Sequence, residues 1–225
     1  MAIFLVLQNS YTSLEFALFD EQQMLDLIVD DKARASKMTI LHVEHLLKKN
    51  RLTLHDISFI AVNQGPGPFT SLRVTIAYAN GLSFAIGKPL IGIDGIAALL
   101  DEKYTNEWPY TVALMNAFNN DLYYAIQTPY GKPTIGYQNS ALLLEQIRNQ
   151  YADQKIHFIG SGVPLVTGSI QELFGDQYSI DSSATEPSLA HIARIALGRW
   201  LKQEHISDQL FPLYLKSSTY KKAQL

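Results

Sequence analysis

Residues 57–87 decide the fold, and they read ISFIAVNQGPGPFTSLRVTIAYANGLSFAIG. The run Ile57–Val62 is rich in β-branched and aromatic residues and predicts a buried strand. A turn rich in Gly and Pro follows at residues 64–68. The apolar segment Phe69–Ile86 then predicts a long helix that ends at the stop signal Gly87–Pro89. A strand joined to a helix by a tight turn is typical of α/β proteins.

Elements on either side continue the alternation of strands and helices. Upstream, three strand-like runs predict an antiparallel meander and one segment has helical spacing: Ile3–Leu7, Ser13–Phe19, Gln22–Val29 and Ser36–Lys49. Downstream, the strand-like runs are Leu90–Ile93, Tyr110–Ala117, Leu122–Thr128 and Ile156–Ile159. The downstream helical segments are Gly95–Leu100, Ser140–Gln150, Val163–Phe174 and a last one from Glu186 to about Lys202.

A polar segment at residues 101–109 is the best candidate for a domain boundary, because it ends in Pro and separates two strand-rich units. We therefore expect two similar α/β halves, each with a mixed sheet. Residues 1–103 form the N-terminal lobe and carry the two long helices, and residues 104–225 form the C-terminal lobe. We expect the last helix either to stay in the C-terminal lobe or to pack back on the N-terminal one.

Composition excludes several classes of protein. The 225 residues include 47% hydrophobic and 17% charged ones, which is typical of a folded chain and excludes disorder as the main state. The net charge of −3 gives the protein no overall positive potential that would attract nucleic acid. The chain has no Cys, which excludes disulfides, a thiolate zinc site, a cysteine nucleophile and an iron–sulfur cluster. No targeting or bilayer-spanning segment is visible, so we expect a cytoplasmic protein without membrane contact.

The helix predicted over Ser36–Lys49 carries two apolar faces. One is the expected core stripe, made of Ile40, Val43, Leu46 and Leu47. The other is a mixed patch of Met38, Leu41, His42 and His45, which a one-sided surface helix does not need. This patch either lies under a loop or in solvent, or belongs to a partner surface. A metal site from the two His is the weakest interpretation, because no third ligand is evident.

The helix predicted over Phe69–Ile86 is apolar nearly all the way round, so every side of it must be covered. Ala77, Gly81 and Ala85 recur every four residues, and another helix could approach closely along that line. The stripe can serve packing within the fold or against a second chain. Together the two helices favour a protein–protein interface.

No motif predicts catalysis. The turn and helix start at Gly65–Arg73 match neither the P-loop nor the dinucleotide pattern, and its Pro residues at 66 and 68 remove two amide donors. A stiff structural turn capped by Thr70 or Ser71 is favoured. Gly160–Gly162 is a turn rather than a serine elbow. The carboxylates that could serve as acid or base show no visible pairing to a His: Asp94, Asp101 and Asp121. We therefore predict no catalytic, cofactor-binding or metal-ligating residue.

Residues 65–73 nevertheless resemble a known motif, Gly-Pro-Gly-Ser-Phe-Thr-Gly-Leu-Arg, and differ from it only at Pro68 and Ser71. The similarity continues through residues 116–123, the last helix and residues 211–216. The chain thus resembles the TsaB (YeaZ) family, the scaffold subunit of the bacterial machinery for tRNA threonylcarbamoyladenosine (t6A). This resemblance implies an actin-like (ASKHA, ribonuclease H-like) two-lobed α/β fold with mixed sheets, no cofactor and no catalysis of its own.

Three departures from the family pattern stand out. Gln8 replaces an Asp at the end of the first strand, residues 116–118 read Asn-Ala-Phe in place of Asp-Ala-Arg, and Ala35-Ser36 replaces His-Ser. In the wider actin-like superfamily, acidic residues at such hairpin ends help to hold magnesium and nucleotide. Neutral side chains remove the charged oxygens that a hard cation needs.

The resemblance also implies partners. TsaD carries the metal and transfers the threonylcarbamoyl group to adenosine 37, TsaE supplies an ATPase, and family members form homodimers when TsaD is absent. Contact with tRNA is expected mainly through the complex. The implied contact face combines the two helices: Met38, Leu41, His42, His45, Val74, Ala77, Tyr78, Gly81 and Ala85.

Other functions stay open beside the scaffold. They are an actin-like ATP-dependent phosphotransferase and a self-associating paralogue that has lost TsaD. A peptidase is disfavoured, because the chain has neither Cys nor a serine elbow. Two basic groups could touch tRNA directly but are expected to be solvated surface: Lys216, Lys221 and Lys222, and Lys48, Lys49 and Arg51.

Overall fold

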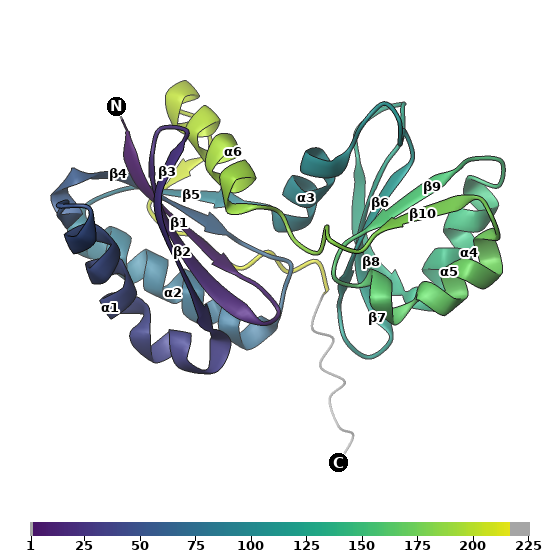
Figure 1. Cartoon of the computed structure of the whole chain (residues 1–225), viewed down its shortest axis with the longest axis horizontal. Coiled ribbons are helices and arrows are strands. Elements are labelled where there is room, and N and C mark those ends of the chain that lie inside the picture. The colour runs from purple at the N-terminus through teal and green to yellow at the C-terminus, as the bar shows by residue number, and fades with distance from the viewer. Residues whose placement is uncertain (1, 217–225) are drawn as a thin grey trace, which may run out of the picture.

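Two mixed β-sheets, one in each half of the chain, form the framework of the computed structural model, which describes residues 2–216, without the side chains of residues 32–37 (Figure 1). The first sheet has the order β11-β5-β4-β1-β2-β3. Its strands are β1 (Ile3–Asn9), β2 (Ser13–Asp20), β3 (Gln23–Asp31), β4 (Ile57–Asn63), β5 (Leu90–Ile93) and β11 (Ile206–Ser207). β1 pairs antiparallel with β2 and parallel with β4, so the sheet is mixed.

The second sheet repeats this topology. Its order is β10-β9-β6-β7-β8, built from β6 (Thr111–Asn116), β7 (Asp121–Gln127), β8 (Thr134–Asn139), β9 (Ile156–Ile159) and β10 (Tyr178–Asp181). In each half an antiparallel meander comes first, and two parallel strands follow on the side of its first strand. The prediction of two similar α/β halves with mixed sheets is confirmed.

Alternation along the strands decides which helix covers which face. The side chains of Leu5, Leu7 and Phe16 point to the face covered by α1 (Lys32–Lys49) and α2 (Phe69–Ile86). Those of Phe4 and Phe19 point to the opposite face, which α6 (Leu189–Lys202) covers. Figure 1 shows α1 and α2 on one side of the first sheet and α6 on the other. Period-two alternation thus gives the first half three layers.

The second sheet is also covered on both faces. α4 (Ser140–Gln150) and α5 (Thr167–Phe174) pack on one face, and α3 (Gly95–Lys103) packs on the other through Ile96, Leu99 and Leu100. Short 3₁₀ turns η1 (Leu54–Asp56) and η2 (Val163–Leu165) precede β4 and α5. Each half therefore receives a helix from across the chain: α3 comes from residues 1–103 and contacts the second sheet, while α6 contacts the first.

The chain after β11 returns along the first half and reaches the second. Asn80 on α2 holds Leu210 by two hydrogen bonds, one from Nδ2 to the Leu210 carbonyl and one from the Leu210 amide to Oδ1, each 2.9 Å. Leu213 donates its amide to the Gln64 carbonyl, and Lys216 reaches Asp121 on the second sheet. Residues 210–216 thus connect the two lobes. No helix in the described part of the chain is long and apolar enough to cross a bilayer.

Candidate functional site

The outward side of α1 and α2 is the first candidate site. The two helices lie next to each other over the first sheet (Figure 1). Of the residues expected on a contact face, most are exposed: Met38, Leu41, His45, Val74, Ala77, Gly81 and Ala85. His42 and Tyr78 are partly buried, and burial raises the pKa of Tyr78 to about 12. The structure therefore brings the predicted residues together on one helix pair.

His42 has a local role. Its Nε2 lies 2.8 Å from Asp30 Oδ2 on β3, and its ring packs 5.3 Å from the Phe16 ring. These contacts tie α1 to the sheet. Within the described residues, no group of three His, Cys, Asp or Glu side chains is arranged to hold a metal.

The prediction that Ile40 belongs to the core stripe is wrong. Its side chain is 70% exposed, whereas Thr39 is buried together with Val43, Leu46 and Leu47. The buried line of α1 passes through Thr39 and Val43, so Ile40 is rotated about 100° from it. Ile40 instead borders a hollow of about 520 Å³ between α1 and α2, lined also by Val43, Leu47, Leu52, Tyr78 and Leu82.

Sequence reasoning missed Phe84, which is 91% exposed on α2. The signal was present, because Phe84 lies off the buried line Leu72, Ile76, Ala79 and Ser83. A large aromatic side chain left in solvent is typical of a surface that another molecule covers. With Met38, Ile40, Leu41 and Val74 it gives the outward side of the pair an apolar character.

The second candidate site is the place where the hairpin turns of the two lobes meet. Tyr11, after β1, donates its hydroxyl to the Asn116 carbonyl at 2.6 Å, and its amide donates to Glu186 Oε1 at 3.0 Å. Its ring lies 6.4 Å from that of Phe118. Burial raises the pKa of the Tyr11 hydroxyl, so this group stays protonated and donates.

Gln8 stands where the resembled family carries Asp, and it is almost completely buried. Its Oε1 accepts from Asn63 Nδ2 at 3.1 Å, and its Nε2 donates to the Pro187 carbonyl at 3.0 Å and to Glu15 Oε2 at 3.3 Å. Asn63 Oδ1 in turn accepts from the Gly65 amide at 2.9 Å. A hydrogen-bond network centred on the Gln8 carboxamide therefore joins β1, β2, β4 and the segment before α6 at this position.

Asn116 also stands where the family carries Asp, and it too has a structural partner. Its Oδ1 accepts from the Phe118 amide at 2.8 Å, which stabilises a turn whose residues 118–120 have positive φ. Asn and Asp tolerate that conformation better than most residues do. The third departure, Ala35-Ser36, lies outside the described side chains.

The start of α2 differs from its prediction. Pro68 occupies the N-cap position and, among the side chains that the structure describes, none caps the helix, so the expected cap from Thr70 or Ser71 is wrong. Ser71 Oγ donates to the Pro68 carbonyl at 3.2 Å instead. Arg73, the last residue of the motif, stacks 3.7 Å from the Phe69 ring centroid and donates Nε to Tyr214 Oη at 2.6 Å. The motif therefore anchors residues 210–216.

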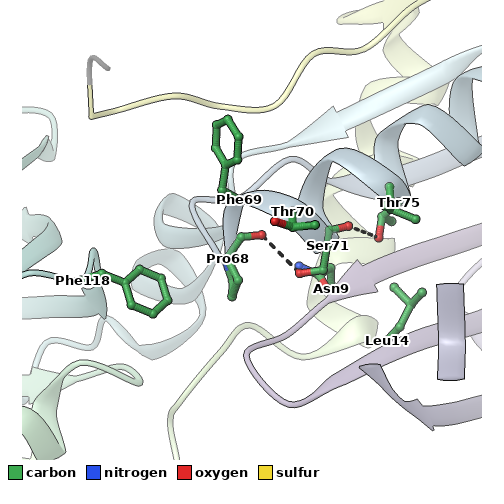
Figure 2. A pocket seen from close by; sticks show the side chains of 9 residues that line it. Asn9, Leu14, Pro68, Phe69, Thr70, Ser71, Thr75 and Phe118 are labelled. Atoms are coloured by element: carbon green, nitrogen blue, oxygen red, sulfur yellow. Dashed lines mark hydrogen bonds between the residues drawn. The ribbon is translucent and has the colours of Figure 1, made fainter. Parts of the chain in front are cut away.

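A cavity of about 510 Å³ opens beside this helix start, lined by Asn9, Leu14, Pro68, Phe69, Thr70, Ser71, Val74, Thr75 and Phe118. Figure 2 shows Asn9 beside the first turn of α2 and Phe118 facing it from the second lobe. The lining combines residues with polar side chains, Asn9, Thr70, Ser71 and Thr75, with apolar ones that include Leu14, Val74 and Phe118.

The three Asp residues named as acid or base candidates are engaged elsewhere. Asp94 caps α3 by accepting from the Ile96 and Ala97 amides, and burial raises the pKa of its carboxyl. Asp101 is paired with His191 Nε2 at 2.9 Å, so the expectation that it has no His partner is wrong. The two residues are 90 positions apart in the chain, which hid the pairing.

The remaining candidates are also placed. Asp121 Oδ2 pairs with Lys216 Nζ at 2.6 Å. Lys216, one of the basic residues considered for tRNA contact, is therefore engaged in an ion pair within the protein. Lys221 and Lys222 lie outside the described residues. Lys48 pairs with Glu44, and Lys49 with Asp26. Gly160 and Gly162 pack against the backbone of Leu114, where a side chain would not fit, as expected of a turn.

Comparison with known sequences gives a family match over most of the chain. A family model described as TsaD, tRNA N6-adenosine threonylcarbamoyltransferase, matches residues 32–223. A tRNA N6-adenosine threonylcarbamoyltransferase of Thermodesulfovibrio yellowstonii is 37% identical over 84 residues, or 36% of this chain and only 25% of that protein. The tRNA threonylcarbamoyladenosine biosynthesis protein TsaB of Haemophilus influenzae is 23% identical over 202 residues, covering 83% of this chain and 82% of that protein.

Solved structures share the fold. YeaZ from Pseudomonas aeruginosa has a TM-score of 0.73 at 22% identity and covers 96% of this chain and 100% of that one. A Bacteroides thetaiotaomicron protein of unknown function with an actin-like ATPase fold has a TM-score of 0.50 at 8% identity, covering 85% of this chain and 95% of that one. The actin-like fold implied by the resemblance is confirmed.

Proposed function

This chain belongs to the tRNA N6-adenosine threonylcarbamoyltransferase (TsaD) family, as a TsaB/YeaZ protein, and we propose that it is a non-catalytic scaffold in t6A formation. In this role the outward side of α1 and α2 binds TsaD, which transfers the threonylcarbamoyl group to adenosine 37 of tRNA. The chain contributes binding surface and leaves the chemistry to its partner.

The exposed apolar outward side of the helix pair is the observation that carries this proposal. Phe84 is 91% exposed and Leu41 51%, on two neighbouring helices. Burying such side chains against a partner is favourable by roughly 25 cal/mol per Å² of apolar surface. A Cβ added at Gly81 would meet no atom of the described residues within 4 Å, so the backbone there is open to a closely approaching helix.

The hairpin ends support the non-catalytic part of the proposal. Gln8 and Asn116 are neutral, and the side-chain oxygen of each accepts a hydrogen bond from another group of the protein. A magnesium–nucleotide site would require charged oxygens that point into the space between the lobes. The alternative of an ATP-dependent phosphotransferase predicts tight binding of magnesium-ATP to this chain alone, which calorimetry would detect.

Further partners follow from the same role. TsaE joins the larger assembly, and tRNA is contacted mainly through TsaD. When TsaD is absent, a second copy of this chain covers the same two helices. The predicted lobes, residues 1–103 and 104–225, serve as one unit, because α6 and β11 of the second stretch join the first sheet, and the first lobe presents the interface.

Reconstitution tests the proposal. TsaD and TsaE from the same genome, with tRNA and the substrates for the threonylcarbamoyl group, are assayed for t6A by mass spectrometry with and without this chain. We expect t6A only when the chain is present, and none from the chain without TsaD. Equal t6A formation without the chain would contradict the scaffold, and t6A formation by the chain alone would contradict its non-catalytic status.

A further inference from the structure

His157 carries a buried ring nitrogen without a partner. It is the second residue of β9 and is only 8% exposed. Alternation along β9 places its ring on the face of the second sheet that α3 covers, because Ile159 packs on that face and Phe158 on the opposite one. Among the described residues, no group forms a hydrogen bond with its Nδ1. An unsatisfied buried polar atom in a folded protein calls for an explanation.

Trp108 packs on this ring from the segment that follows α3. The two rings are nearly parallel, at 20°, and their centroids lie 4.9 Å apart. Trp108 belongs to residues 104–110, which connect α3 to β6. Its amide donates to the Thr105 carbonyl at 3.1 Å, and its carbonyl accepts from Thr111 Oγ at 2.7 Å. The stack of Trp108 on His157 therefore fastens this connection to the second sheet.

The stacked arrangement fits only the neutral form of His157. A neutral imidazole can carry its proton on Nε2 and leave Nδ1 as a lone pair. An imidazolium carries a proton on both nitrogens, so protonation would place a charged N–H group in a buried position without an acceptor. Burial accordingly lowers the pKa of His157 below its ordinary value of 6.5.

The charged groups around His157 do not remove this cost. Asp181 on β10 and Glu107 in the connection raise the pKa of His157, and Lys103 on α3 lowers it. Burial is nevertheless the largest effect. Asp181 already accepts from the Ser183 amide at 2.9 Å, and its Oδ2 lies 3.9 Å from Lys103 Nζ. Neither carboxylate is a hydrogen-bond partner of Nδ1, so a protonated ring gains an acceptor for that nitrogen only by moving.

We propose that His157 and Trp108 form an acid-sensitive latch for residues 104–110. At neutral pH the uncharged ring stays against Trp108 and holds the connection on the second sheet. Protonation drives the ring out of the stack toward solvent, so that Trp108 and the connection detach while both sheets stay folded. Because the connection begins where α3 ends, its release also loosens the end of the helix that crosses from the first half of the chain to the second sheet.

Nuclear magnetic resonance on the full chain tests the latch. The ring signals of His157 and the indole N–H of Trp108 are followed from about pH 8 to about pH 4.5. We expect His157 to titrate below pH 6.5 and Trp108 to shift with the same midpoint, while the amide signals of both sheets persist. A ring that Trp108 instead holds by cation–π attraction would titrate above its ordinary pKa. That result, a Trp108 signal that does not follow the ring, or a shift seen only when the sheets unfold would overturn the latch.

Variants separate the latch from general effects of acid. His157→Phe keeps a ring against Trp108 but cannot take up a proton. Amide hydrogen exchange at residues 104–110 should be several-fold faster in wild type than in His157→Phe at about pH 5, and equal in the two at about pH 7.5. His55→Gln removes an exposed His on η1 and should match wild type at both pH values. Equal exchange in wild type and His157→Phe at about pH 5 would contradict the proposal. If His157→Phe does not fold, the titration of the wild-type chain decides alone.

Discussion

At the residue scale, the amides that replace charged family residues act as structural groups. Asn63 Nδ2 donates to Gln8 Oε1 and its Oδ1 accepts from the Gly65 amide, both in buried surroundings. Removing Asn63 leaves these two partners buried and unsatisfied. Such groups cost about 1–3 kcal/mol each.

Asn63→Ala should therefore lower the free energy of unfolding by about 2–4 kcal/mol, as measured by urea denaturation. Asn149→Ala is the matched control, because Asn149 is exposed on α4, and it should change that free energy by less than about 0.5 kcal/mol. Equal effects of the two substitutions would show that the network around Gln8 contributes no stability.

Glu15 gives a prediction of pH dependence. Burial raises the pKa of its carboxyl, although hydrogen bonds from Gln8 and Ser13 act in the opposite direction. The folded state therefore binds this proton more tightly than the unfolded state, and the associated stability is lost as pH rises through the raised pKa. Glu15→Gln removes the titration.

The free energy of unfolding of Glu15→Gln, relative to wild type, should therefore increase as pH rises from the ordinary carboxyl range through the raised pKa of Glu15. Above that pKa the difference should level off. Urea denaturation at a series of pH values measures it. Parallel pH profiles for the two proteins would mean that Glu15 titrates alike in the folded and unfolded states.

The sequence could predict which residues depart from the family but not what they bond to. Gln8 and Asn116 are visible as neutral replacements from the motif alone. Their partners are not, because Gln8 bonds to Asn63 and Pro187, which are 55 and 179 positions away. A long separation in sequence, 90 positions, likewise hid the Asp101–His191 pair. Contacts between residues far apart in the chain depend on how the strands and helices are arranged, and no pattern in the local sequence indicates them.

At the element scale, α2 shows why some boundaries are predictable. It runs from Phe69 to Ile86 as expected, because Pro68 precedes it and Gly87 ends it in the left-handed conformation. β8 and β10 were missed because neither contains a fully buried residue, so neither shows an apolar run or a strict alternation. α1 was predicted four residues short. Val43, Leu46 and Leu47 of its predicted core stripe are buried, but Thr39 rather than Ile40 faces the core at the N-terminal end of the stripe.

Phe84 tests whether α2 presents a contact surface. Phe84→Ala should change the free energy of unfolding of the monomer by less than about 0.5 kcal/mol, because the side chain is 91% exposed. Self-association should weaken about tenfold or more, as expected for a buried aromatic anchor. Sedimentation equilibrium measures the association. Leu201→Ala on α6, at 72% exposed, is the control and should leave association unchanged; equal weakening by both would argue against a surface on α2.

At the scale of the whole molecule, a few polar contacts join the lobes. Tyr11 donates to the Asn116 carbonyl at 2.6 Å, and Lys216 Nζ lies 2.6 Å from Asp121 Oδ2. The crossing of α3 and α6 between the halves adds apolar contacts. The sequence predicted two lobes and left open whether the last helix packs back on the first one. It did not predict that α3 covers the second sheet, because the apolar face of a helix does not specify which sheet it covers.

Tyr11→Phe combined with Lys216→Met should loosen the lobes. We expect faster amide hydrogen exchange at residues 10–13 and 118–121, and a free energy of unfolding lower by about 1–2 kcal/mol. Lys132→Met, on an exposed turn of the second lobe, is the control and should alter neither. Unchanged exchange at both turns in the double variant would show that these two bonds do not hold the lobes together.

The proposed binding of TsaD to the outward side of α1 and α2 is tested most directly at Gly81. Gly81 and Gly198 are both helical glycines whose added Cβ would meet no atom within 4 Å in the described part of the chain. Leu at either position should therefore leave the monomer folded and equally or slightly more stable. Calorimetric titration of TsaD with Gly81→Leu and Gly198→Leu isolates the interface. We predict at least tenfold weaker binding for Gly81→Leu and wild-type binding for Gly198→Leu; wild-type affinity in both would contradict the account.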